Sequence, residues 1–186
     1  MKKFILTDET IEMFGVTLHR IKAVRSFGNV KEGDLGGFVE KEENISEHFE
    51  AWVSGNAKVS GNAKVWGNAK VSGNAEVSGN AEVWGNAKVW GNAKVSGNAI
   101  VSGNAEVLGN AEVLGNADYI VFKNWWSSGR YFTWTRKNNM WSVGCFYGTG
   151  KELIKKAYAD SEKSGREYER VVRFVESILE DEKNEK

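Results

Sequence analysis

The sequence predicts a mainly β protein, built around a parallel β-solenoid that is followed by a small C-terminal α/β module. The tripeptide Gly-Asn-Ala recurs eleven times at six-residue intervals, from Gly55 to Gly115. Self-similarity at a fixed short period is the mark of a solenoid, in which each repeat packs on its neighbours. After Ala117 the repeat stops, and aromatic-rich strand patterns are followed by two segments of helical periodicity.

The repeat unit reads Ala-x-Val-x-Gly-Asn, and strand geometry explains its composition. In the unit 63–68, alternate side chains point to opposite faces, so the alanine and the valine point inward while Lys64 and Trp66 point outward. Valine suits a strand and fills the interior. Glycine and asparagine tolerate left-handed backbone angles best, so we expect Gly67 and Asn68 to form a corner.

This array, residues 51–117, resembles the hexapeptide-repeat family. The resemblance implies a left-handed parallel β-helix, in which three units make one triangular coil. The handedness follows from the resemblance alone, because parallel crossovers are otherwise nearly always right-handed. An array of this kind is expected to be a scaffold rather than an active site.

The outward charges support coils of three units. Opposite charges on adjacent strands are favourable, and like charges are not. When the position before each valine is read at three-unit spacing, one column alternates in sign, a second begins with opposite charges, and a third is less regular. These columns are Lys58, Glu76, Lys94 and Glu112; Lys64, Glu82 and Ile100; and Trp52, Lys70, Lys88 and Glu106.

The position after each valine places large apolar side chains on the outside of the array. Trp66 and Trp84 are expected to stack on one face, and Trp90 and Leu108 on another. Exposed apolar residues on a flat sheet usually mark a contact surface. We expect self-association or packing by the terminal segments; a platform for a sugar or a base, and incidental exposure, are the alternatives.

Residues 1–50 are expected to form an N-terminal cap, because the open edge of a solenoid would otherwise template aggregation. Residues 18–24 have the pattern of a strand, and residues 33–39 and 44–46 resemble degenerate coils that lead into the array.

Residues 118–186 are expected to form the C-terminal module. Thr149 and Glu152 have the spacing of a capping box at the start of a helix. Strands are predicted at residues 119–123, 130–136 and 140–146, and helices at about residues 150–162 and 166–180.

The aromatic and basic residues of this module are the main candidates for a binding site. Aromatic faces stack on bases, and arginine pairs with phosphates in a fork. The alternatives are that these residues form the core of a small sheet packed against the two helices, or a surface for a protein partner. The candidates are Trp125, Trp126, Arg130, Tyr131, Phe132, Trp134, Arg136, Lys137 and Trp141.

We predict no catalytic residue, metal site or cofactor. The best-known hexapeptide-repeat proteins are acyltransferases with a histidine base, but the array contains no histidine; His19 and His48 precede it. Cys145 is expected to be buried and inert. The segment 148–151 lacks the full spacing of a phosphate-binding loop.

Charge and composition narrow the classes of partner that the chain is expected to bind. The formal net charge is zero, so no overall field attracts the chain to nucleic acid or membranes. No stretch approaches the length of a membrane helix, and a single cysteine fits a reducing cytoplasm.

The combination of N-terminal segment, array and α/β tail resembles hexapeptide-repeat proteins of bacteriophages and prophages. The resemblance implies the cytoplasm of a bacterial host and a homo-oligomer, most commonly a trimer. We expect a non-catalytic binding protein that captures a component of host defence, either a nucleotide-like signal or a host protein. The alternatives are an acyltransferase that uses His48 or His19, and a purely structural assembly protein.

Overall fold

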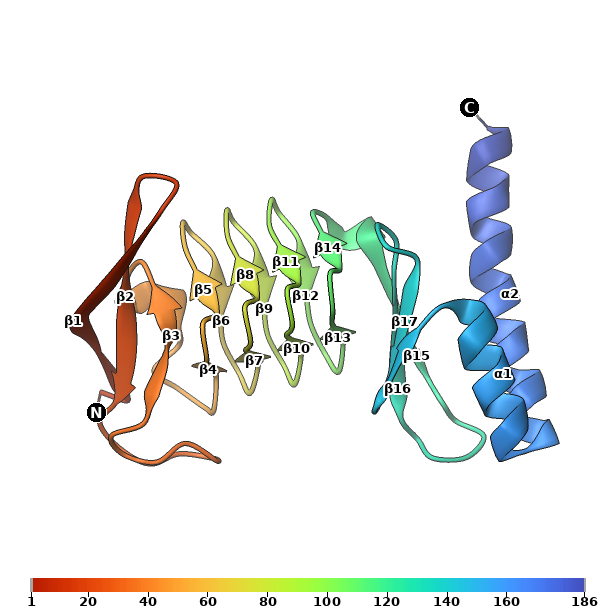
Figure 1. Cartoon of the computed structure of the whole chain (residues 1–186), viewed down its shortest axis with the longest axis horizontal. Helices are drawn as coiled ribbons and strands as arrows, with labels where there is room; N and C mark the ends of the chain where they lie inside the picture. Colours follow the sequence, from red (N-terminus) through yellow and green to blue (C-terminus); the bar gives the residue numbers. More distant parts are fainter. Residues whose placement is uncertain (1, 186) are drawn as a thin grey trace.

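The computed structural model describes residues 2–185 and confirms the predicted fold class. The N-terminal cap, a solenoid of about four turns and the C-terminal module follow one another along the long axis of the molecule (Figure 1). The solenoid strands are parallel, and its faces continue from coil to coil.

Each solenoid strand is two residues long and pairs with the strand one coil, or 18 residues, away. Three faces result, with strand orders β5-β8-β11-β14, β13-β10-β7-β4 and β12-β9-β6. The three outward columns predicted from charge are therefore confirmed. The strands are β4 (Trp52–Val53), β5 (Lys58–Val59), β6 (Lys64–Val65), β7 (Lys70–Val71), β8 (Glu76–Val77), β9 (Glu82–Val83), β10 (Lys88–Val89), β11 (Lys94–Val95), β12 (Ile100–Val101), β13 (Glu106–Val107) and β14 (Glu112–Val113).

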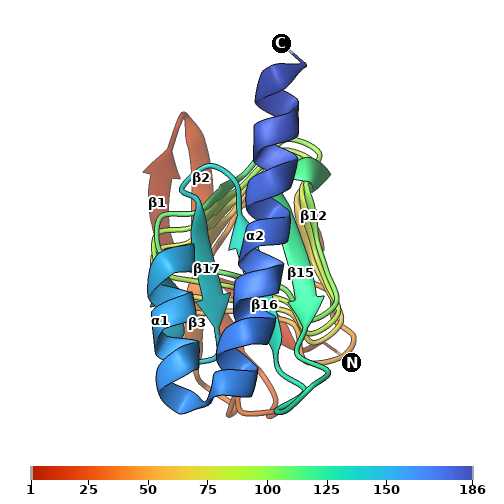
Figure 2. The ribbon, with the colours of Figure 1, turned by 90° about the vertical axis from the view of Figure 1, so that its right-hand side faces the viewer.

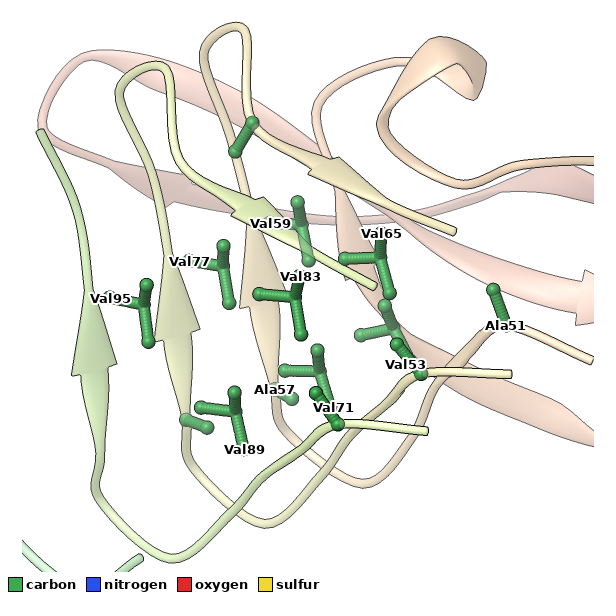
Figure 3. Close-up of a cluster of buried hydrophobic side chains, with 14 of the residues drawn as sticks. Ala51, Val53, Ala57, Val59, Val65, Val71, Val77, Val83, Val89 and Val95 are labelled. Carbon is green, nitrogen blue, oxygen red and sulfur yellow. The ribbon is translucent and has the colours of Figure 1, made fainter. Parts of the chain in front are cut away.

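The repeated alanines and valines fill the interior, as predicted. Their relative exposure is 1% or less from Ala51 to Val113. Figure 3 shows valines from different coils stacked in rows inside the solenoid. Each buried valine contributes roughly 1.5–3 kcal/mol relative to an exposed one, so the repeated valine is the main source of stability in each coil.

The corners combine left-handed glycines with ladders of asparagine amides. Gly85 has φ +72°, and a Cβ added there would lie 2.9 Å from the backbone of the next coil. Along one corner, the Nδ2 of Asn68 donates to Oδ1 of Asn86 at 3.2 Å, and the Nδ2 of Asn86 donates to Oδ1 of Asn104 at 3.3 Å. The amides thus point in one direction, with the donor end towards the C-terminus.

The N-terminal cap is a hairpin joined to a degenerate coil. β1 (Phe4–Met13) and β2 (Val16–Ala23) are antiparallel, and β3 (Leu35–Val39) pairs with β2 on one side and in parallel with β5 on the other. A short 3-10 turn, η1 (Glu42–Asn44), follows, and Ile45 then bridges Val65 in parallel. The predicted strand at residues 18–24 and both degenerate coils are confirmed, whereas β1 was not predicted.

The C-terminal module has a four-stranded antiparallel sheet and two helices. One face of the sheet lies against the last coil, and α1 and α2 cover the other face (Figure 2). The elements are a 3-10 turn, η2 (Asn116–Asp118), β15 (Tyr119–Lys123), β16 (Tyr131–Thr135), β17 (Met140–Val143), β18 (Phe146–Gly148), α1 (Gly150–Asp160) and α2 (Glu162–Asn184).

Two predictions for this module were wrong in detail. The strand predicted at residues 140–146 is two strands, because Gly144 has φ +56° and turns the chain. Cys145 lies in that turn and is exposed, not buried. The predicted capping box is present, with the Thr149 side chain accepting from the Glu152 backbone and the Glu152 carboxylate accepting from the Thr149 backbone.

Candidate ligand site at the junction of the solenoid and the C-terminal sheet

Strand β16 divides the predicted aromatic set by the alternation of its side chains. Phe132 and Trp134 are each 1% exposed and face the helices, where Trp141 of the next strand, 2% exposed, joins them. The indole nitrogen of Trp134 donates to Oδ1 of Asn139 at 2.8 Å. These three rings therefore belong to the module's core, and none of them offers a face to a ligand.

Two of the predicted basic residues hold the module together. The guanidinium of Arg136 donates to both carboxylate oxygens of Glu182, at 2.6 and 2.9 Å, and to the carbonyl of Ala117 at 3.1 Å. The hydrogen bonds to Glu182 raise the pKa of Arg136. Lys137 forms an ion pair with Glu112 of the last coil at 3.0 Å. Their first role is to fasten α2 and the solenoid to the sheet.

The two predicted tryptophans that precede β16 have different surroundings. Trp126 is half-buried, with ring centroids 5.3 Å from Tyr168 and 6.2 Å from Phe132. Trp125 is 78% exposed and touches Trp126 edge-on. Trp126 thus extends the core, and Trp125 alone lies on the surface.

Arg130 and Tyr131 are the two predicted residues that the fold brings together at a concave surface. They line an open hollow of about 320 Å³ between β16 and the solenoid. The solenoid contributes the charged pair of the third column and two members of an asparagine ladder, and the β17–β18 turn contributes a glycine. The other lining residues are Asn86, Lys88, Asn104, Glu106 and Gly144.

The charges of the hollow leave one cation unpaired. Lys88 and Glu106 neutralise each other at 2.9 Å. The guanidinium of Arg130 is exposed and has no ion pair among residues 2–185. Lys123 adds a second positive charge next to Tyr131, with its Nζ 5.7 Å from the centroid of that ring. The site is therefore weakly positive.

Asn104 adds a directed hydrogen-bond donor. It is the last asparagine of its ladder, so its Oδ1 accepts from Asn86 while its Nδ2 has no partner within the described part of the chain. Amides aligned head to tail polarise one another and strengthen the terminal donor. An acceptor in the hollow would satisfy this amide as well as Arg130.

Arg130 also borders a second, smaller crevice of about 70 Å³ beside α1. This crevice is lined by apolar and aromatic side chains together with one lysine and one aspartate. Its other lining residues are Val143, Phe146, Leu153, Lys156, Ala157, Asp160 and Tyr168. Arg130 therefore borders both the junction hollow and this crevice, and a ligand held by Arg130 can contact both.

The predicted contact face is only partly exposed. Trp66 and Trp84 stack as predicted, with ring centroids 5.0 Å apart and planes 16° apart, and Trp90 is 46% exposed. The prediction that Leu108 is exposed was wrong, because Leu108 is 6% exposed. It lies in the last coil, where the C-terminal module packs and the ring of Tyr147 lies against Gly109.

The two histidines lie at the opposite end of the molecule from this hollow. His19 in β2 has its Nδ1 3.2 Å from the carbonyl oxygen of Thr7. His48 is exposed and lines a separate hollow with Lys2, Arg25, Glu42 and Glu47. Residues 2–185 contain no cluster of metal-ligating side chains, and no helix among them is long and apolar enough to cross a membrane.

Five residues of the junction hollow were not predicted as site residues. Lys88 was recognised only as a member of a charge column, and Asn86 and Asn104 only as corner residues. Their approach to Arg130 depends on how the sheet docks on the last coils, where the Thr133 hydroxyl oxygen accepts from the Glu106 backbone at 2.9 Å. A repeat pattern carries no signal for that docking.

Comparison with protein-family models and with curated proteins finds no match for this chain.

Proposed function

We propose that the protein is a non-catalytic binding protein that captures a small phosphate-bearing, nucleotide-like ligand at the junction hollow. The observation that carries the proposal is an arginine with no ion pair among residues 2–185, beside a half-buried tyrosine in a hollow of about 320 Å³. That volume lies at the lower end of the range for small-molecule sites, roughly 300–1,000 Å³.

Different residues of the hollow would recognise different parts of the ligand. The Arg130 guanidinium offers a planar fork to a phosphate, and the Nδ2 of Asn104, which has no partner in the described part of the chain, offers a further donor. The ring of Tyr131 offers a surface on which a base can stack. The Lys88–Glu106 pair supplies both a donor and an acceptor without adding net charge.

The solenoid is proposed to act as a rigid frame in a homo-oligomer, for which a trimer is the arrangement that the hexapeptide-repeat resemblance implies. Several copies of one site on a frame raise avidity without new contacts. We propose that this activity operates in a bacterial cytoplasm, as the resemblance to bacteriophage and prophage proteins implies, where sequestering a nucleotide signal would blunt host defence. Light scattering at several protein concentrations tests the oligomer.

The ligand proposal is tested by native mass spectrometry with a panel of nucleotides and cyclic nucleotides, followed by calorimetry on any that bind. We expect Arg130→Ala to weaken binding about tenfold or more, because a hydrogen bond to a charged group contributes roughly 1.5–3 kcal/mol. Tyr131→Ala should also weaken it. The matched control is Arg166→Ala, which removes an exposed arginine from α2.

The outcomes separate the proposal from its competitors. Binding that Arg166→Ala preserves and Arg130→Ala removes supports the junction site. Binding that survives both Arg130→Ala and Tyr131→Ala shows that the site is elsewhere. If no nucleotide adds mass to the protein, the proposed ligand class is wrong.

A further inference from the structure

A further hollow lies on another face of the solenoid, at the N-terminal end of the tryptophan stack. Its volume is about 370 Å³. It is formed where the degenerate first coil meets the face β12-β9-β6. The lining residues are Glu43, Ser46, Lys64, Val65, Trp66 and Glu82.

The coil geometry places this hollow where a third ring of the tryptophan stack would lie. Ile45 bridges Val65, and the Ser46 backbone donates to the Val65 carbonyl at 2.9 Å. Ser46 therefore stands one coil before Trp66, just as Trp66 stands one coil before Trp84. Strands in a sheet are about 4.8 Å apart, which is close to the 5.0 Å between the two indole rings.

Trp66 turns one face of its indole ring to Trp84 and the other towards Ser46. The serine side chain is far smaller than an indole, so the space that a third ring would occupy is open. Trp66 is 39% exposed, although it stacks on Trp84. A flat ligand placed over Ser46 would cover the remaining face of the ring.

The charged residues around this space favour a neutral polar ligand. Glu43 and Glu82 accept hydrogen bonds and repel anions, and Lys64 donates hydrogen bonds and repels cations. None of the three forms an ion pair among residues 2–185, so all three are available to a ligand. A ring that carries several hydroxyl groups needs both donors and acceptors in this arrangement.

We infer that this hollow is a carbohydrate subsite, in which the apolar face of a pyranose ring packs on Trp66 and its hydroxyls bond Glu43, Lys64 and Glu82. Tyrosine and tryptophan are suited to such sites, because a large apolar ring is combined with polar surroundings. The inference does not depend on the junction hollow, which is on a different face and of opposite charge.

The test uses substitutions at the two ends of the stack. Ser46→Trp places a ring where the sugar would lie, and it extends the stack, so it should block binding without unfolding the protein. Ser102→Trp is the matched control, because Ser102 stands one coil after Trp84 at the other end of the same column. Trp66→Ala removes the platform, and Trp90→Ala removes an exposed tryptophan from another face.

Binding is followed by the indole N–H signals in two-dimensional NMR, with N-acetylglucosamine, glucose and their β-1,4-linked tetramers as probes and adenosine and thymidine as flat non-sugar controls. We expect at least one tetramer to bind with a Kd of about 1 mM or lower and to shift the Trp66 signal. Ser46→Trp should abolish the shift of the Trp66 signal, and Ser102→Trp and Trp90→Ala should preserve it. In Trp66→Ala, the remaining indole signals, including that of the neighbouring Trp84, should show no saturable shift.

Three results would overturn the inference. One is the absence of saturable binding by any of the sugars. Another is binding that Ser46→Trp leaves unchanged or that Ser102→Trp removes. The third is preferential binding of the nucleosides at Trp66, which would make the hollow a base-stacking site.

Discussion

Lys3 should make the protein more stable as the pH rises through the alkaline range. Its side chain is fully buried, and its ammonium donates to the carbonyls of Ser46 and Ala51 in the N-terminal cap. Burial lowers the pKa of Lys3 from 10.5 to about 8; the Glu47 carboxylate opposes this shift, and the positive charges of Arg25 and Lys70 add to it.

The sign and size follow from proton linkage. Below pH 8 the lysine is protonated in the folded and unfolded states, so folding bears the full cost of burying its charge. Between pH 8 and 10.5 the unfolded chain holds more protons than the folded one, and stability therefore rises with pH. The pKa of Lys3 differs between the unfolded and folded states by 10.5 − 8 = 2.5. At 1.36 kcal/mol per pH unit, this difference raises the free energy of unfolding by about 3 kcal/mol.

The assay is urea unfolding of the wild type and of Lys3→Met at a series of pH values across that range. Methionine keeps the length of the side chain and removes its charge, so titrations elsewhere in the chain cancel in the difference between the two proteins. As the pH rises, the free energy of unfolding of the wild type should increase by about 3 kcal/mol relative to that of the variant. A difference that is flat, or that falls with pH, would refute the reasoning.

Three further changes test other parts of the structure. Gly85→Ala should lower the free energy of unfolding by about 1 kcal/mol more than Gly33→Ala, because both glycines have positive φ but only a Cβ at Gly85 meets the next coil; thermal unfolding measures this. Arg136→Ala should cost about 1 kcal/mol and speed amide exchange in the last turns of α2, because it breaks the pair with Glu182. The exposed Cys145 should react with a thiol reagent in the native protein at the rate of a free thiol.

The array could be predicted from sequence because each of its requirements repeats. Only a small residue fits beside each corner, only an apolar one fits the interior, and the register is fixed by the alternation of faces. The outward charges then distinguished the coil length, and the ion pairs Lys58–Glu76 and Lys88–Glu106 form at the predicted spacing.

The elements outside the array depend on single contacts, which no periodic pattern in the sequence indicates. β1 mixes charged and apolar residues, and it is a strand because β2 offers an edge and the turn at Phe14 and Gly15 takes positive φ at both positions. Cys145 is exposed because Gly144 turns the chain one residue earlier. Trp134 and Arg136 were both predicted as candidates for a binding site, but the helices that cover the sheet decide whether such residues bind a ligand or form a core.

The positions of the two proposed sites follow from the same property that makes the array predictable. Identical coils stacked in register present flat, continuous faces, and a flat face cannot surround a small ligand. Concavity requires a break in the repeat. The hollow at Trp66 forms where Ser46 of an irregular coil precedes an indole, and the junction hollow forms where Arg130 overhangs the last coils. In a solenoid of this kind, ligand sites should therefore be sought where the regular coils meet the segments that cap them.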